Sequence, residues 1–210
     1  MEPILWNNYL SILPKKFRKK IEKFNKWEDR QCTLLGKLLL LEGLKKYFLD
    51  KDCLDLICYN EWGKPFFKNG PDFNISHSGN ITICAICDGI NIGVDIEKIS
   101  AINLDDFESY MSEEQWCLIK QAKDPYSVFF SFWTIKESVI KADGKGLSIP
   151  LTEVNLENSM VDLYNKKWHI KEISLHKGFA CCIASDIEKP GINIRKINVD
   201  SFEFWRTPQI

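Results

Sequence analysis

The chain has 210 residues, 45% hydrophobic and 27% charged, which is ordinary for a globular protein and long enough for one large domain or two small ones. The formal net charge of -1 argues against nucleic-acid wrapping as the main task. No apolar run reaches the length of a membrane span, and the N-terminus lacks the pattern of a signal peptide, so a cytoplasmic protein is expected.

The first part of the chain is predicted to be helical. Pro14 suits the start of a helix, and a leucine-rich helical stripe follows from about Glu28 to Phe48. The stretch from Asp50 to Asp55 is predicted to end this helical region. Beyond it the hydrophobic period becomes that of strands.

Four short candidate strands come next, separated by glycine, proline and asparagine. Their sequences are LDLICYN, DFNISHS, ITICAIC and NIGVDIE. The Asp88-Gly89 pair between the last two is a hairpin signal. An antiparallel meander is therefore expected after the helices.

The second half repeats this order. A helical region is predicted from about Asn103 to Asp143, with a break near Asp124-Pro125. The strand-like pieces WHIKEISL, FACCIAS and IRKINV follow. In addition, SHSGNITICAICD from Ser76 resembles LHKGFACCIASD from Leu175, which indicates two similar α+β halves.

Eight cysteines raise the question of a metal site. Cys84 and Cys87 form a C-x-x-C, but both lie in a predicted strand and would face opposite sides. A second pair with similar spacing is missing from the sequence. Buried free thiols in a reducing cytoplasm are the favoured interpretation.

One strand carries two carboxylates. In NIGVDIE the apolar residues fall on one face, whereas Gly93, Asp95 and Glu97 fall on the other, with the glycine expected to leave open space beside the acids. A half-exposed strand with a solvated face is one interpretation. A functional interpretation requires a cation between the like charges.

Two further segments supply complementary groups. FNISHSGN, from Phe73, concentrates hydroxyls and an imidazole at a turn, which either holds an anion such as phosphate or is capped by its own serines. The helix in FWTIKESVIKADGKGLSIPL carries Glu137 and Lys141 at i and i+4, and Gly144 is expected to end it. Taken alone, Glu137 and Lys141 would form a surface ion pair.

Together these segments form a coherent set. Asp95, Glu97 and Glu137 would make an oxygen site of the kind that Mg²⁺ prefers, with places left for substrate phosphates. A nearby lysine and histidine could neutralise a diphosphate. The set favours attack at phosphorus over redox or acyl chemistry.

In these residues the chain resembles the 4′-phosphopantetheinyl transferases of the surfactin-synthetase-activating type. Four motifs occur in the order of that family, and they span residues 63–146. They are Gly63-Lys64-Pro65, the N-x-S-H-S from Asn74, the G-V-D-I-E from Gly93, and the W-x-x-K-E-S-x-x-K from Trp133 followed by Gly144-Lys145-Gly146.

The resemblance implies two similar α+β subdomains, residues 1–100 and 101–210, related by a pseudo-twofold, each with helices on a mainly antiparallel sheet and with the active site in the cleft between them. It implies an enzyme of the holo-[acyl-carrier-protein] synthase type. Such an enzyme transfers the 4′-phosphopantetheine arm of coenzyme A to a serine of an apo carrier protein and releases adenosine 3′,5′-bisphosphate.

Residue roles follow from the same resemblance. Asp95, Glu97 and Glu137 are the implied ligands of Mg²⁺, or of Mn²⁺ in its place. Glu137, Lys141 and His77 are the implied catalytic residues; whether Glu137 or a metal-bound water takes the serine proton stays open. Coenzyme A contacts are implied for Lys16, Lys19, Lys20, Thr33, Lys64, Pro65, Ser76, His77 and Lys141.

The expected partners are coenzyme A and apo peptidyl, acyl or aryl carrier domains, with no nucleic acid and no membrane, and the protein is expected to be a monomer. The aromatic segment SVFFSFW lines a docking groove or, in the favoured interpretation, belongs to the core. Two other functions compete with the transferase: a metal-dependent phosphoesterase that uses the same carboxylates, and a non-catalytic module that binds coenzyme A or carriers.

Overall fold

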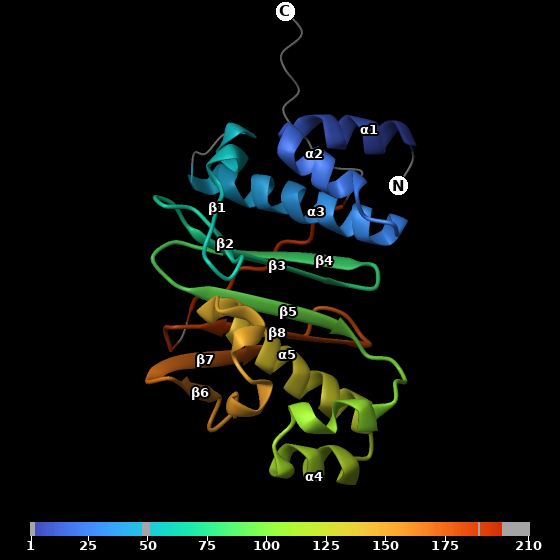
Figure 1. Cartoon of the computed structure of the whole chain (residues 1–210), viewed down its shortest axis with the longest axis vertical. Helices are drawn as coiled ribbons and strands as arrows, with labels where there is room; N and C mark the ends of the chain where they lie inside the picture. Colours follow the sequence, from blue (N-terminus) through green and yellow to red (C-terminus); the bar gives the residue numbers. More distant parts are fainter. Residues whose placement is uncertain (1–2, 48–50, 189, 199–210) are drawn as a thin grey trace, which may run out of the picture.

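The computed structural model describes residues 3–47, 51–188 and 190–198, and it has the predicted α+β class. Two halves are stacked along the long axis, and in each a long helix packs against an antiparallel sheet (Figure 1). Among the described residues, no helix is long and apolar enough to cross a membrane.

The first half begins with three helices, which are α1 (Pro3–Ile12), α2 (Lys15–Glu22) and α3 (Trp27–Leu44). Pro14 stands at the N-cap of α2, as predicted. The leucine stripe buries one face of α3 in the core of this half, which confirms the predicted helix up to Leu44. Short 3-10 helices follow at Lys45–Tyr47 and Lys51–Leu56. The described residues of the predicted break therefore form a 3-10 helix, and Phe48 and Asp50 lie outside the described residues.

The strands of the first half do not form the expected meander. Strand β1 (Cys58–Tyr59) pairs with β2 (Pro65–Phe66), and β3 (Asp72–Ser78) pairs with β4 (Ile81–Cys87). The next strand, β5 (Ile92–Lys98), leaves β4 and pairs antiparallel with a strand from the end of the chain. The meander prediction was wrong at this step because β5 pairs with β8 (Phe179–Ser185), which lies more than eighty positions further along the chain.

The second half contains α4 (Glu113–Gln121) and α5 (Pro125–Asp143), followed by β6 (Met160–Leu163), β7 (Lys166–Glu172) and β8 (Phe179–Ser185). Its sheet has the order β5-β8-β7-β6, and α5 packs across it (Figure 1). The predicted break near Asp124 is confirmed, since this residue caps the start of α5. Gly144, with φ 87°, ends the helix as expected.

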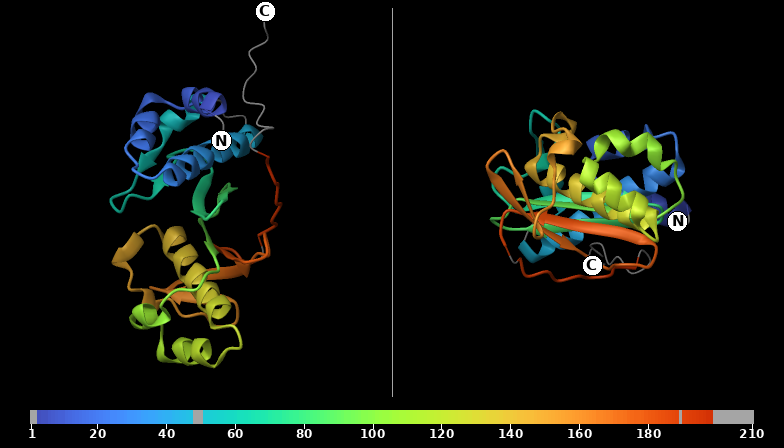
Figure 2. Two further views of the ribbon diagram at one scale, coloured as in Figure 1. Left: turned by 90° about the vertical axis from the view of Figure 1, so that its right-hand side faces the viewer. Right: turned by 90° about the horizontal axis from the view of Figure 1, so that it is seen from below.

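The third strand predicted for the second half, IRKINV, is absent in its described part. Residues 190–198 have no regular secondary structure and run back along the outside of the first half (Figure 2). Arg195 pairs there with Glu42 of α3, with Nη2 and Oε1 3.6 Å apart. The ion pair with α3 links this segment to the first half, where a strand had been predicted. Val199, the last residue of the predicted strand, lies outside the described residues.

The pairing of β5 also affects where the chain divides into two subdomains. The proposed boundary at residue 100 leaves β5 in the first half, whereas its backbone pairs with β8 of the second. The pairing favours a boundary just before β5, and we propose the two units on that basis.

A row of polar side chains on β3 joins the two halves. Every second side chain of β3 accepts a hydrogen bond from a backbone N–H of β5, so these N–H groups bind side chains and not a neighbouring backbone. The four bonds run from Ile92 to Asp72 (2.9 Å), Val94 to Asn74 (3.1 Å), Ile96 to Ser76 (3.4 Å) and Lys98 to Ser78 (3.0 Å). Strand β5 therefore lies between β8 and β3, at the centre of the molecule.

Removing one acceptor from this row should weaken the fold. Asn74 is 7% exposed and Val94 is 3% exposed, so Asn74→Ala leaves a buried N–H without its acceptor. We expect the free energy of unfolding to fall by about 1–3 kcal/mol. Urea unfolding measures this, with exposed Asn193→Ala as the matched control. Equal stability of Asn74→Ala and the control would show that the bond contributes nothing.

The remaining predictions about the interior are largely confirmed. In SVFFSFW, Phe129 and Phe130 are buried in the core beside α4, which supports the core interpretation of this segment. No disulfide joins any of the eight cysteines, all of which lie in the described part of the chain. Four of them are buried and three are half-buried, among these Cys84 and Cys87, whereas Cys117 is exposed, so the prediction of buried thiols was wrong for Cys117.

Candidate active site

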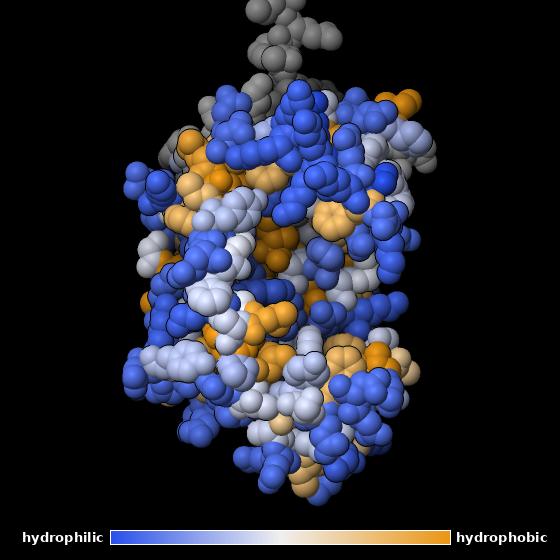
Figure 3. Space-filling model, in the orientation of Figure 1, coloured by the Kyte–Doolittle hydropathy of each residue, from blue (hydrophilic) through white to orange (hydrophobic). Residues whose placement is uncertain are grey.

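A cavity of about 400 Å³ opens between the two halves. Its walls are α3, the loop between β1 and β2, β3 and the C-terminal end of α5, and the surface is hollowed there on the face drawn in Figure 3. Six of the residues implied as site residues line it: Thr33, Lys64, Pro65, His77, Glu137 and Lys141.

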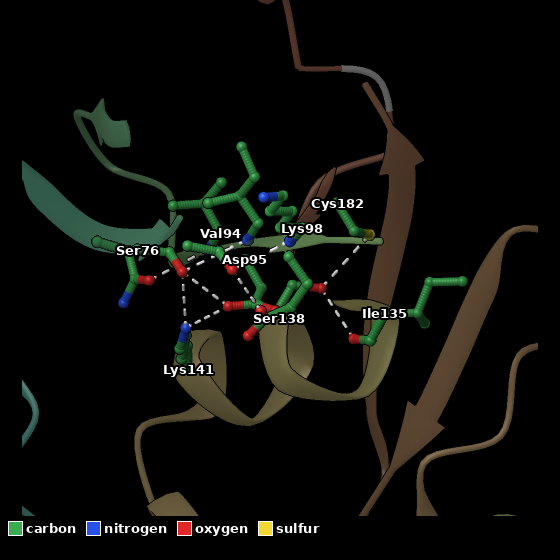
Figure 4. Close-up of polar contacts among 12 residues, drawn as sticks. Ser76, Val94, Asp95, Lys98, Ile135, Ser138, Lys141 and Cys182 are labelled. Carbon is green, nitrogen blue, oxygen red and sulfur yellow. Dashed lines mark hydrogen bonds and ion pairs between the residues drawn. The ribbon is translucent and has the colours of Figure 1, made fainter. Parts of the chain in front are cut away.

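Asp95 lies beside this cavity, at the centre of a small polar network. Its Oδ1 atom accepts hydrogen bonds from Ser76 Oγ at 2.7 Å and from Lys141 Nζ at 2.5 Å (Figure 4). The residue is only 2% exposed, and its Oδ2 atom is buried with no hydrogen-bond partner among the described residues. Asp95 thus has one oxygen available for a further ligand.

The other two acids of the predicted set lie within electrostatic reach of Asp95. Burial raises the pKa of Glu97, and the negative charges of Asp95 and Glu137 raise it further, against the hydrogen bond that Glu97 accepts from Ser78 at 2.7 Å. Burial and Asp95 likewise raise the pKa of Glu137, although Lys141 opposes them. The fold therefore collects three carboxylates around one lysine.

These acids do not stand in the arrangement of a metal-ligand cluster. Within the described ranges, no group of three or more His, Cys, Asp or Glu side chains is placed to hold a metal ion. The Lys141 ammonium is instead the cation that faces Asp95. The metal site made of Asp95, Glu97 and Glu137 therefore stays a prediction.

Lys141 and Glu137 do not form the surface ion pair considered from their spacing. No ion pair joins these two described side chains, and Lys141 reaches from α5 to Asp95 and Ser76 on two strands of different halves. The i and i+4 positions put both side chains on the cavity wall, and the contact between α5 and β5 determines the partner of Lys141.

Gly93 explains how α5 comes so close to β5. A Cβ atom at this position would lie 2.0 Å from the backbone oxygen of Ser138 and 2.4 Å from the backbone nitrogen of Ala142. The expectation that Gly93 leaves open space beside the acids was therefore wrong, because the helix backbone fills that space. This close approach brings Glu137 and Lys141 next to Asp95.

Comparison with known proteins places this geometry in a family. Residues 2–88 match the model described as "4'-phosphopantetheinyl transferase, N-terminal", and residues 91–184 match the model "4'-phosphopantetheinyl transferase superfamily". The 4'-phosphopantetheinyl transferase gsp of Aneurinibacillus migulanus is 35% identical over 181 residues, which cover 82% of this chain and 76% of that protein. The chain belongs to the 4′-phosphopantetheinyl transferase superfamily.

A second relative of this chain is the 4'-phosphopantetheinyl transferase Sfp of Bacillus subtilis, 38% identical over 148 residues. That match covers 68% of this chain but 65% of Sfp, slightly less than two thirds of its length. A solved Thermotoga maritima holo-[acyl-carrier-protein] synthase covers 48% of this chain and 64% of its own, with 19% identity and a TM-score of 0.36, which is too low to support an argument.

The basic residues implied as coenzyme A contacts do not all lie in the cavity lining. Lys16 donates to the carbonyl of Asp55 at 2.9 Å, and Lys20 lies 5.9 Å from the ring centre of Tyr59. With exposed Lys19, these residues lie outside the cavity lining, so their role stays a prediction. Lys64 does line the cavity, but its ammonium joins the two halves by binding Asp72 and the carbonyl of Ala142, each at 3.0 Å.

Lys136 belongs to the W-x-x-K-E-S-x-x-K motif, and the resemblance implies no role for it. Its side chain is fully buried, and its ammonium donates to the carbonyls of Leu151 (2.7 Å) and Val154 (2.8 Å). Burial lowers the pKa of Lys136 to about 8. The available signal was its helical neighbourhood, because the residues three and four positions away on both sides are apolar: Phe132, Trp133, Val139 and Ile140.

Lys136 should therefore contribute to the stability of the fold and not to catalysis. Lys136→Met leaves two carbonyls without their donor, and we expect the free energy of unfolding to fall by about 2 kcal/mol. Thermal unfolding tests this against exposed Lys167→Met as the control. A variant as stable as the control would refute the role of these two hydrogen bonds in holding the segment after α5.

Proposed function

We propose that this chain transfers the 4′-phosphopantetheine arm of coenzyme A to a serine hydroxyl of an apo carrier protein, in a Mg²⁺-dependent reaction that releases adenosine 3′,5′-bisphosphate. The observation that carries the proposal is the contact of Lys141 with Asp95 beside a cavity that both halves line. Family membership supports the same reaction.

Coenzyme A would lie in this cavity, with its diphosphate bound by Lys141 and His77. His77 is exposed on β3, and Lys141 of α5 lines the same cavity. Two cationic or hydrogen-bonding groups from different halves would hold the diphosphate in one orientation. The proposed binding site therefore requires both halves.

The acidic residues fit a bound divalent cation in their chemistry. Carboxylate oxygens are the ligands that Mg²⁺ and Mn²⁺ prefer, and the Oδ2 atom of Asp95 is buried without a hydrogen-bond partner in the described structure. Asp95, Glu97 and Glu137 would hold the ion. When bound, it supplies positive charge that stabilises the negative charge developing on the leaving phosphate.

Residues of this chain would accept the proton of the carrier serine and stabilise the negative charge of the diphosphate. The serine oxygen forms a bond to the phosphorus that carries pantetheine, and the bond from that phosphorus to the bridging oxygen breaks. Glu137 would accept the serine proton, since burial raises the pKa of its carboxylate and makes it a stronger base. Lys141 would donate hydrogen bonds to the diphosphate as it separates.

Product analysis separates this function from its competitors. The chain is incubated with coenzyme A and Mg²⁺, with and without an apo peptidyl carrier domain, and adenosine 3′,5′-bisphosphate is measured by chromatography. We expect release only with the carrier present and none with EDTA. Equal release without a carrier would support a phosphoesterase, and no release with any apo peptidyl, acyl or aryl carrier would support a binding module.

A further inference from the structure

Asn60, in the loop between β1 and β2, belongs to none of the four motifs and does not line the cavity. Its side chain is half-buried. The oxygen of its amide accepts hydrogen bonds from the backbone N–H groups of Trp62 at 3.0 Å and Lys64 at 2.8 Å. The nitrogen of the same amide donates to the carbonyl of Gly144 at 2.9 Å. One side chain thus shapes the β1–β2 loop and joins it to the end of α5.

The oxygen and the nitrogen of this amide have different tasks. An oxygen acceptor alone is enough to hold a turn, and aspartate and serine side chains hold turns in the same way. Only the amide nitrogen can donate to a carbonyl, so the bond to Gly144 is the one that requires asparagine. The bond between the two halves, and not the shape of the loop, therefore accounts for the residue type at position 60.

The carbonyl groups at the end of α5 receive their donors from the first half. The last four carbonyls of a helix have no partner within the helix. In α5 the Gly144 carbonyl binds Asn60, and the Ala142 carbonyl binds the Lys64 ammonium at 3.0 Å. Gly144 is buried, and a Cβ atom there would lie 2.8 Å from Cδ of Lys64. The loop and the helix end are therefore in close contact.

The two segments that Asn60 joins are opposite walls of the cavity, since one comes from each half. The lining residues of the loop and of the helix end are Trp62, Gly63 and Lys64, and Gly144, Gly146 and Leu147. We propose that Asn60 is a positioning residue that holds these walls at the separation that coenzyme A requires. This inference rests on the proposed function, since it assumes that coenzyme A occupies the cavity.

The chemical step should depend less on Asn60 than the binding of coenzyme A does. The close packing of α5 on β5 at Gly93 and the contact of Lys141 with Asp95 hold the reacting end of the site, and neither involves Asn60. A loss of the bond to Gly144 would let the loop and the helix end separate. Part of the binding energy of coenzyme A would then be used to bring them together.

Asn60→Asp tests the inference, because it removes the donor and keeps an acceptor for Trp62 and Lys64. In carrier modification we expect the KM for coenzyme A to rise about fivefold, the effect of losing one ordinary hydrogen bond, while kcat and the KM for the carrier stay unchanged. Calorimetric titration with coenzyme A and Mg²⁺ should show the same loss of affinity. Asn193→Asp, the same change at an exposed residue, is the matched control and should behave as the unmodified chain.

Asn60→Ser separates the lost bond from the added charge of Asn60→Asp. Its hydroxyl is a neutral acceptor for the loop and is too short to reach Gly144, so it should weaken coenzyme A binding to the same extent. A loss of affinity in Asn60→Asp alone would assign the effect to the charge and overturn the inference. Thermal unfolding of both variants establishes that they are folded, and failure of both to fold would show a purely structural role, which also overturns it.

Two other results would contradict the inference. One is affinity for coenzyme A equal to that of the control in both folded variants. The other is a fall in kcat at an unchanged KM for coenzyme A. Failure of the proposed function is distinguishable from both, because the unmodified chain itself would then bind no coenzyme A or modify no carrier.

Discussion

Asp95→Asn is expected to reduce kcat/KM for carrier modification about a thousandfold, the size of effect that several kcal/mol of lost charge stabilisation produces. The amide has the shape of the carboxylate, so it retains an oxygen that can accept the hydrogen bond from Ser76. It loses the negative charge that faces Lys141 and the anionic oxygen that a divalent cation would bind. Carrier modification at saturating Mg²⁺, followed by intact mass spectrometry over time, measures the effect.

The matched control is Asp162→Asn, an exposed acid on β6 outside the cavity lining, which should retain full activity. Circular dichroism and thermal unfolding of both variants establish that they are folded. A folded Asp95→Asn variant with the activity of the control would show that Asp95 neither holds a metal ion nor positions Lys141.

Gly93→Ala is expected to destabilise the protein by about 3 kcal/mol or more, at the upper end of the cost of overpacking. The new methyl group would overlap backbone atoms of α5, and backbone cannot rotate away as a side chain can. Separating β5 from α5 would also displace Lys141 from Asp95, so activity should fall together with stability. Urea unfolding and the rate of carrier modification measure the two effects.

Gly191→Ala provides the control for this change. A Cβ at Gly191 would meet no atom within 4 Å, so the same substitution there should leave stability and activity unchanged. If Gly93→Ala unfolds at the same urea concentration as Gly191→Ala, the close packing of β5 on α5 does not hold in solution.

Local patterns were sufficient to predict the elements that carry the site. The period of two along NIGVDIE places Asp95 and Glu97 on one face of a strand, and the structure has that strand as β5. The helical spacing of Glu137 and Lys141 places both on one face, and both line the cavity. Gly144 ends α5, as expected from the sequence. Each of these features depends on neighbours within a few positions.

Features that depend on distant segments could not be predicted in this way. The pairing of β5 with β8 joins residues more than eighty positions apart, and no local pattern states which strand is the partner. The role of Gly93 depends on α5, and the acceptors on β3 depend on β5.

The most direct test of the transferase activity is the intact mass of an apo peptidyl carrier domain after incubation with this chain, coenzyme A and Mg²⁺. We predict a gain of one phosphopantetheine group on the carrier serine, absent with EDTA and absent when that serine is replaced by alanine. An unchanged carrier mass with the folded chain, on this carrier and on an apo acyl carrier protein, would contradict the proposed function.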